Sequence, residues 1–210
     1  MRFKNRSEAG KKLADLLLQY KNKDVVVYAL PRGGVVTAKE IAKKLNAPLD
    51  LLITRKIGHP NQAEYALSAV TENGNVVGDK KQIASIDKYW FAREVEKEKQ
   101  EAKRRRSLYL ANQKSISVKG KTAIIVDDGI ATGLTIKAAI ADCKKRKPAK
   151  IVIAVPIAPY QTAKELKTQA DEVIALETPG EFYAIGGYYN EFPQVSDEEV
   201  IKIMYNYSIQ

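Results

Sequence analysis

The sequence predicts an α/β protein with a mostly parallel central sheet flanked by helices. Two observations lead to this prediction. Short apolar runs rich in β-branched residues alternate along the chain with segments whose apolar residues recur at helical spacing. The runs are also apolar throughout, which is typical of strands buried on both faces of a sheet. Such sheets bind ligands beyond the carboxyl ends of their strands, so the residues that follow each strand are the first candidates for function.

The composition is that of a globular protein and excludes several classes. The 210 residues are 45% hydrophobic and 29% charged, which rules out collagen-like and disordered chains. Cys143 is the only cysteine and His59 the only histidine, which excludes an internal disulfide and argues against a zinc site or a histidine triad. No apolar run approaches the roughly 18 residues of a membrane span, and the N-terminus has no apolar leader, so we expect a cytoplasmic protein without a membrane segment.

The charge of the chain favours an anionic partner. It carries 35 basic and 25 acidic residues, for a formal net charge of +10. Nucleic acid and phosphorylated metabolites both meet this requirement. Charge alone does not choose between them.

The first part of the chain is predicted to run helix, strand, helix, strand. Residues 7–20 place leucines at helical spacing, with Ser7 as a possible N-cap. The apolar run over 24–30 predicts a strand, the sequence PRGG follows it, and residues 35–46 return to helical spacing. Residues 47–54 predict the next strand.

Residues 87–113 differ from the rest because they combine dense charge with few apolar positions. They predict one long and largely solvated helix, in which Glu101 and Arg105 form a favourable pair four residues apart. The basic run KRRR at 103–106 is a candidate for binding nucleic acid. A charge run on a polar helix is more often a solvated face, which is the preferred interpretation here.

The second half repeats the alternation of strand and helix. Strands are predicted over 121–128, 149–158 and 172–176, and helices over 133–145, near 160–169 and from Ser196 onward. The segment from 178 to 210 concentrates Tyr, Phe, Gly and Pro. This composition predicts a loop-rich flap packed on the main sheet.

The segment IIVDDGIATGLT at residues 124–135 carries the clearest chemistry. A buried strand ends in Asp127 and Asp128, and a turn of small residues then opens a helix. Small residues let backbone N–H groups approach a phosphate, the helix N-terminus adds its dipole, and threonines add hydroxyl groups. Carboxylates beside a phosphate are repulsive unless they bind hydroxyls or a metal. The segment therefore favours a sugar phosphate over phosphate alone.

This segment resembles the 5-phosphoribosyl-1-pyrophosphate (PRPP) signature of type I phosphoribosyltransferases, and ALPRGG at 29–34 resembles their pyrophosphate loop. The resemblance implies the type I phosphoribosyltransferase fold, as a single domain over 1–210 with a core at about 20–178 and a C-terminal hood mainly over 178–210. It implies a Mg²⁺-dependent, homodimeric transferase that displaces pyrophosphate from PRPP with a nitrogenous base, as in nucleotide salvage. It also implies a non-proline cis peptide between Pro31 and Arg32.

The resemblance implies a role for each matching residue. Asp127 and Asp128 are expected to hold the ribose hydroxyls and to contact the metal indirectly, through those hydroxyls or water. Arg32, Gly33 and Gly34 are expected to hold pyrophosphate. The turn is expected to bind the 5-phosphate through Gly129, Ile130, Ala131, Thr132, Gly133 and Thr135.

Two further segments resemble parts of the same family. RKIGHPNQAEYAL at 55–67 stands where members carry a mobile lid, and Lys56 there is expected to assist the departing pyrophosphate. TPGEFYAIGGYYNEF at 178–192 resembles the hood that covers the base in the purine enzymes. This likeness implies that Phe182 stacks on the base and that the backbone around Tyr183 reads its edge.

The resemblance assigns no particular base. Ala131 stands where hypoxanthine-guanine enzymes have an aspartate, and Pro156 stands where they have a lysine that reads the base. One alternative is a regulator of the same fold that senses PRPP or a nucleotide and binds nucleic acid through its basic surface. The net charge and the basic run at 103–106 favour the regulator, whereas the intact pyrophosphate loop and lid favour catalysis. Hydrolysis or another transfer at a phosphorylated sugar would use the same site.

Overall fold

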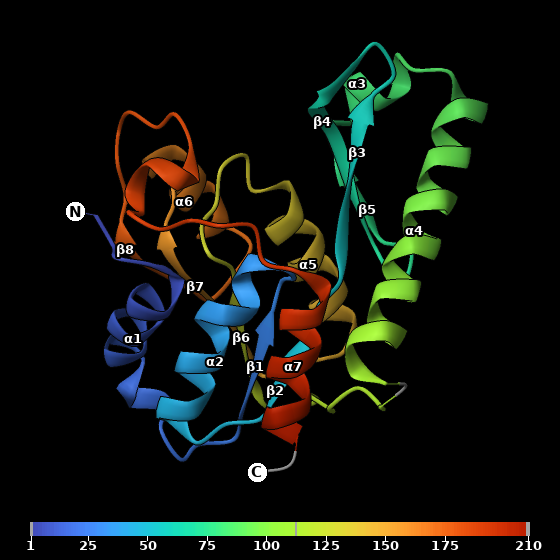
Figure 1. The fold of residues 1–210 in the computed structure, drawn as a ribbon. Coiled ribbons are helices and arrows are strands. Elements are labelled where there is room, and N and C mark those ends of the chain that lie inside the picture. The colour runs from blue at the N-terminus through green and yellow to red at the C-terminus, as the bar shows by residue number, and fades with distance from the viewer. Residues whose placement is uncertain (1, 112, 209–210) are drawn as a thin grey trace.

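The computed structural model describes residues 2–111 and 113–208, and this part of the chain forms two sheets (Figure 1). The strands are β1 (Val25–Ala29), β2 (Leu49–Leu51), β3 (Thr54–His59), β4 (Gln62–Thr71), β5 (Val76–Gly78), β6 (Thr122–Val126), β7 (Lys150–Ile157) and β8 (Glu172–Glu177). The main sheet has five parallel strands in the order β2-β1-β6-β7-β8. The smaller sheet is antiparallel, in the order β3-β4-β5. The predicted mostly parallel α/β sheet is therefore confirmed.

Helices cover both faces of the main sheet. The helices of the described residues are α1 (Arg6–Leu16), α2 (Gly33–Leu45), α3 (Lys80–Ala84), α4 (Lys88–Leu110), α5 (Leu134–Lys145), α6 (Tyr160–Leu166) and α7 (Asp197–Ser208), with 3-10 turns η1 (Leu18–Tyr20) and η2 (Ile185–Tyr188). Of these, α3 and α4 pack on the smaller sheet. One apolar cluster joins α1, α2 and α7 to the sheet, and a second joins α5 and α6 to its other face. In the described part of the chain, no helix is long and apolar enough to cross a membrane.

The strand sequences explain why the sheet is buried on both faces. Successive side chains of a strand point to opposite sides. In β1, Val25 and Val27 join the cluster under α1 and α2, whereas Val26 and Tyr28 join the cluster under α5. Every residue of β1 is buried. A continuous apolar run is therefore what this position in the sheet requires.

The opening helix starts earlier than expected. Its N-cap is Asn5, whose side chain accepts a hydrogen bond from the backbone N–H of Glu8 at 3.1 Å. The expectation of a cap at Ser7 is wrong, because the Ser7 hydroxyl lies within the helix and donates to Glu40 at 2.8 Å. The helix also ends at Leu16, and a 3-10 turn follows it.

The segment after β2 holds a hairpin that the sequence did not predict. Residues 55–67, which stand where the family carries a mobile lid, lie in β3 and β4. These two strands pair antiparallel with each other, and β4 also pairs antiparallel with β5. The role of this hairpin as a lid stays a prediction. Helix α4 confirms the long helix predicted over 87–113, and it packs on β3 and on α7. Figure 1 shows the small sheet and α4 together on one side of the main sheet. We call residues 54–110 the arm.

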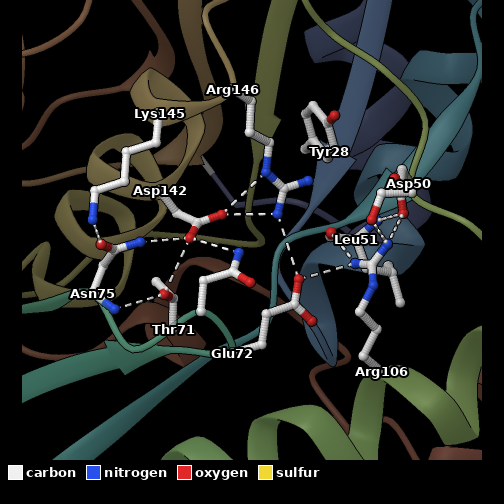
Figure 2. Close-up of polar contacts among 12 residues, drawn as sticks. Tyr28, Asp50, Leu51, Thr71, Glu72, Asn75, Arg106, Asp142, Lys145 and Arg146 are labelled. Atoms are coloured by element: carbon white, nitrogen blue, oxygen red, sulfur yellow. Dashed lines mark hydrogen bonds and ion pairs between the residues drawn. The ribbon is translucent and has the colours of Figure 1, made fainter.

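A buried polar network fastens the root of the arm to α5 (Figure 2). The Asp142 carboxylate accepts hydrogen bonds from Thr71 Oγ1 at 3.2 Å, Asn73 Nδ2 at 2.9 Å and Asn75 Nδ2 at 2.6 Å. It also forms an ion pair with Arg146 at 2.8 Å. Burial by itself would raise the pKa of Asp142, but these hydrogen bonds and the charge of Arg146 lower it.

A second carboxylate continues this network toward α4. Glu72 Oε1 accepts from Arg106 Nη1 at 3.3 Å and from Arg146 Nη2 at 3.4 Å. Arg106 also donates to the Asp50 carboxylate at 3.1 Å and to the Leu51 carbonyl at 2.9 Å. Arg106 therefore joins α4 to the edge strand β2 and to the base of the hairpin, as Figure 2 shows.

Candidate active site

A cavity of about 250 Å³ lies where β1 and β6 end. It is lined by Pro31, Arg32, Gly33, Lys56, Asp127, Asp128, Gly129, Ile130, Ala131, Thr132, Gly133, Thr135 and Ile185. Segments far apart in the sequence therefore meet at the carboxyl edge of the sheet, where parallel α/β folds bind their ligands. Of the residues predicted to hold PRPP, Gly34 alone is outside this lining, and it lies directly behind it against Asp127.

The PRGG loop packs tightly against the acidic pair. The peptide bond between Pro31 and Arg32 is cis. A Cβ atom on Gly33 would lie 1.8 Å from Asp128 Oδ2, and one on Gly34 would lie 2.9 Å from the Asp127 Cα atom. Since real Cβ atoms do not approach other atoms so closely, both positions require glycine. The loop and the acidic pair therefore form one packed unit.

The two aspartates have different environments. Asp127 lines the cavity, and its Oδ1 accepts a hydrogen bond from the backbone N–H of Asp128 at 2.8 Å. Burial and the neighbouring Asp128 carboxylate raise the pKa of Asp127 well above its ordinary value, against an opposing effect of Lys56. Asp128 forms an ion pair with Arg6, whose Nε lies 2.6 Å from Asp128 Oδ2.

The turn after the acidic pair opens helix α5. Gly133 is the N-cap of this helix and has a φ of +76°, a conformation that favours glycine. The turn is tied to its neighbours because Ile130 N–H donates to the Ile157 carbonyl at 2.8 Å and Thr162 Oγ1 donates to the Ala131 carbonyl at 3.1 Å. The resulting site combines a helix N-terminus with threonine hydroxyls, which is chemistry suited to an anion.

Of the two adjacent basic residues Arg55 and Lys56 on the arm, one reaches the cavity. Lys56 on β3 lines it. Arg55 turns away, since its Nε pairs with Glu98 Oε2 of α4 at 2.7 Å. Lys56 therefore adds positive charge to the side of the cavity that the arm provides, and α4 holds the strand that carries it.

The hood lies over the cavity through Ile185. Phe182 stacks on Tyr188, with ring centroids 5.9 Å apart and planes 10° apart, and Tyr183 is 92% exposed. Neither Phe182 nor Tyr183 is among the residues that line the cavity. Their assignment to a base therefore stays a prediction.

Several residues of this region were not singled out from the sequence. Arg32 Nη1 lies 3.4 Å from Asp197 Oδ1, and the Tyr109 hydroxyl donates to the same carboxylate oxygen at 2.6 Å. The Tyr189 hydroxyl donates to the Asp128 carbonyl at 2.6 Å. The sequence predicts a helix from Ser196 onward, and an acidic residue such as Asp197 is favourable in the first turn of a helix. Nothing in the sequence pattern places it beside the PRGG loop.

The basic run on α4 is largely occupied by contacts within the chain. Arg104 and Arg105 pair with Glu101 at 2.7 and 2.8 Å. Arg106 is part of the network at the root of the arm. This arrangement fits the interpretation of the run as a structural and solvated face.

Comparisons with known proteins agree with this geometry. The family model of the phosphoribosyl transferase domain matches residues 4–189. Two curated proteins named "Putative phosphoribosyl transferase", from Mycobacterium tuberculosis strains CDC 1551 and H37Rv, are 42% identical over 204 residues, which is 96% of this chain. The chain spans 46% of the length of these relatives.

Solved structures show the same fold. The protein TT1426 from Thermus thermophilus is 37% identical, with a TM-score of 0.83 over 99% of both chains. A purine phosphoribosyltransferase from Pyrococcus horikoshii is 19% identical, with a TM-score of 0.50 over 91% of this chain and 92% of its own. The family match, together with a PRGG loop, an acidic pair and a phosphate-type turn around one cavity, leads to one conclusion. The chain belongs to the phosphoribosyl transferase domain family and has the type I phosphoribosyltransferase fold.

Proposed function

We propose that the chain transfers the phosphoribosyl group of PRPP to a nitrogenous base, with release of pyrophosphate and inversion at the anomeric carbon. The observation that carries this proposal is the meeting of the PRGG loop, Lys56, the acidic pair and the 129–135 turn around one cavity. The PRGG loop with Lys56 matches the diphosphate of PRPP, the acidic pair matches its ribose, and the turn matches its 5-phosphate. The proposal treats residues 1–210 as one domain with a hood mainly over 178–210.

Each part of PRPP is assigned to its own group of residues. The carboxylates of Asp127 and Asp128 accept hydrogen bonds from the ribose hydroxyls. The backbone N–H groups and threonine hydroxyls of the turn hold the 5-phosphate. Arg32 and the N–H groups of Gly33 and Gly34 hold the diphosphate, with Lys56 approaching from the arm.

Magnesium fits this arrangement through PRPP. Among the described residues, no group of three or more His, Cys, Asp or Glu side chains could hold a metal ion alone. Mg²⁺ is commonly bound by one or two carboxylates together with substrate phosphates. Asp127 and Asp128 would therefore hold it indirectly, through the ribose hydroxyls or water, and when bound it would neutralise charge on the departing pyrophosphate.

The residues of the chain act by positioning and by charge. Positive charge develops at the anomeric carbon as the bond to pyrophosphate lengthens, and nearby carboxylates stabilise it. Arg32 and Lys56 stabilise the negative charge that accumulates on pyrophosphate. Closure of the arm and hood would exclude water from the reacting carbon.

The hood is the proposed acceptor side of the site. Phe182 stacks on the base and the backbone around Tyr183 reads its edge. This assignment requires the hood to move toward the cavity, because neither residue lines it in the structure. The family likeness also leads us to expect a homodimer in nucleotide metabolism. The base is identified by testing which nucleobase stimulates the release of pyrophosphate.

Calorimetric titration with PRPP, with and without Mg²⁺, tests the proposal. The wild type is expected to bind PRPP in a Mg²⁺-dependent manner, and the double variant Asp127→Asn/Asp128→Asn is expected to lose this binding. Pyrophosphate release is then measured with a panel of nucleobases. Release stimulated by one base would establish the transferase and name its acceptor.

Two other outcomes would argue against the transferase. Binding of PRPP without release by any base would favour a sensor of the same fold. Absence of binding to both PRPP and nucleoside monophosphates would overturn the assignment of the cavity.

A further inference from the structure

Arg6 makes a set of contacts that the proposed roles do not use. It is the first residue of α1, and its Nε lies 2.6 Å from Asp128 Oδ2. Its Nη1 donates to the Pro193 carbonyl at 2.7 Å. Its guanidinium carbon lies 3.7 Å from the centre of the Phe192 ring. One side chain therefore contacts the acidic pair and the hood segment together.

This ion pair is buried, and burial reduces its net contribution to the stability of the fold. The side chains of Arg6 and Asp128 are only 9% and 13% exposed. Removing two charges from water costs about as much as their attraction returns, so a buried pair is a weak source of net stability. A guanidinium does, however, fix the direction of a carboxylate, because it is planar and its donors point in set directions. Orientation is therefore the more natural role for Arg6.

The surroundings leave the Asp128 side chain little freedom. Gly33 packs against it so closely that a Cβ atom would lie 1.8 Å from Asp128 Oδ2 and 2.9 Å from Arg6 Nε. The Tyr189 hydroxyl donates to the Asp128 carbonyl at 2.6 Å. Tyr189 also stacks on Phe192, with centroids 4.7 Å apart, so the hood residues that touch Arg6 and Asp128 touch one another.

We propose that Arg6 is a positioning residue for the transfer reaction, which holds the Asp128 carboxylate in the orientation that binds a ribose hydroxyl. The inference rests on the proposed function, because it gives Asp128 the ribose. Arg6 acts from behind the carboxylate, on the side of α1, and has no place in the lining of the cavity. Its contacts with Phe192 and Pro193 set the hood against the same carboxylate.

A double-mutant cycle on PRPP binding tests this role. We expect Arg6→Met to weaken PRPP binding about 10- to 100-fold, which is the size of the loss of one hydrogen bond to a charged group. Asp128→Asn should cause a loss of similar size. If Arg6 acts through Asp128, then adding Arg6→Met to Asp128→Asn should change the affinity less than about twofold.

Arg2→Met is the matched control, since Arg2 lies in the same segment and donates to the hood carbonyl of Gly187 at 3.1 Å without reaching Asp128. It should bind PRPP as the wild type does. In steady state, Arg6→Met should raise the KM for PRPP more than it lowers kcat. Arg6→Lys keeps the charge without the fork of donors, and should recover part of the affinity.

Circular dichroism and thermal unfolding establish that each variant is folded. If Arg6→Met is not folded, Arg6→Gln, which also lacks the charge and the fork of donors, takes its place in the cycle under the same criteria. Wild-type affinity in the Arg6 variant, or a loss that adds fully to that of Asp128→Asn, would overturn the positioning role alone. A wild type that does not bind PRPP would overturn the proposed function and this inference with it.

Discussion

Asp142→Asn tests whether the polar network at the root of the arm stabilises the protein. The Asp142 side chain is 3% exposed and is the nearest anion to Arg146 among the described residues, and the Arg146 side chain is itself 18% exposed. Its replacement leaves the guanidinium largely buried, with Glu72 Oε1 at 3.4 Å as its remaining anionic neighbour in the network. The asparagine amide N–H₂ would also face N–H donors, either those of Arg146 or those of Asn73 and Asn75, where the carboxylate now accepts hydrogen bonds. Breaking one side of a buried ion pair costs about 3–5 kcal/mol.

We expect the lower end of this range, about 3 kcal/mol, because asparagine keeps the shape and one acceptor oxygen. With a urea dependence of about 2 kcal/mol per molar, the unfolding midpoint should fall by about 1.5 M. Asp15→Asn is the control. Asp15 pairs with Lys44 at 3.0 Å with both side chains about half exposed, so its loss should cost less than about 1 kcal/mol.

The pH dependence of this difference has a defined sign. The folded state lowers the pKa of Asp142 below its ordinary value of 3.8. The stabilisation is therefore complete above that value and is lost as the pH falls through the lower pKa of the folded state. The gap in unfolding free energy between wild type and Asp142→Asn should narrow in that window. A loss at pH 7 no larger than that of Asp15→Asn would refute the assignment of the network as the anchor of the arm.

Three further predictions concern the cavity. Gly33→Ala should reduce PRPP affinity at least about tenfold in calorimetry, because its Cβ would displace the Asp128 carboxylate and cost a hydrogen bond to a charged group. Gly187→Ala is the control and should have no effect, because no described atom beyond its neighbours in the chain lies within 4 Å of the added Cβ. Lys56→Met should weaken the binding of inorganic pyrophosphate more than Arg55→Met does, and equal losses would contradict the separate directions of the two side chains. Asp127→Asn should abolish PRPP binding yet raise the unfolding free energy at pH 7, since a pKa raised by folding means that the ionised carboxylate opposes the folded state. Denaturation at pH 7 that shows a less stable Asp127→Asn protein would contradict the last of these.

The main sheet could be predicted from the sequence because its strands carry their own signal. Apolar β-branched runs, each followed by a helical segment, identified β1, β6 and β7 to within a few residues. The acidic pair and its turn were also predictable, because they occupy one continuous segment directly after β6.

The hairpin of the arm gave no such signal. β3 is half-buried at most positions and carries Arg55, Lys56 and Gly58, so it lacks the apolar alternation of an ordinary strand. β3 forms because it pairs with β4 and packs against α4. Both are tertiary contacts and not a local preference of its sequence. Local sequence therefore indicates a loop at this position where the fold makes a sheet.

Contacts between distant segments were also beyond prediction. Arg6 and Asp128 are separated by 122 residues, and neither has a neighbour in the sequence that points to the other. An arginine in the first turn of a helix is ordinarily unfavourable for the helix dipole. That local disadvantage is understandable only once the buried carboxylate beside it is known.

The pairing of residues 3–6 with the hood has a consequence for biosynthesis. Arg6 and Pro193 are 187 residues apart, and Phe3 bridges to Tyr189. At about 5–20 residues per second, a ribosome takes roughly 10–40 s to make the intervening chain. For all of that time, the buried aromatic Phe3 and the cation Arg6 lack their native contacts with the hood. Closing so large a loop is also entropically slow. The Asp128 carboxylate, which is the proposed partner of the ribose, should therefore be among the last groups to acquire its native surroundings, after the sheet has formed.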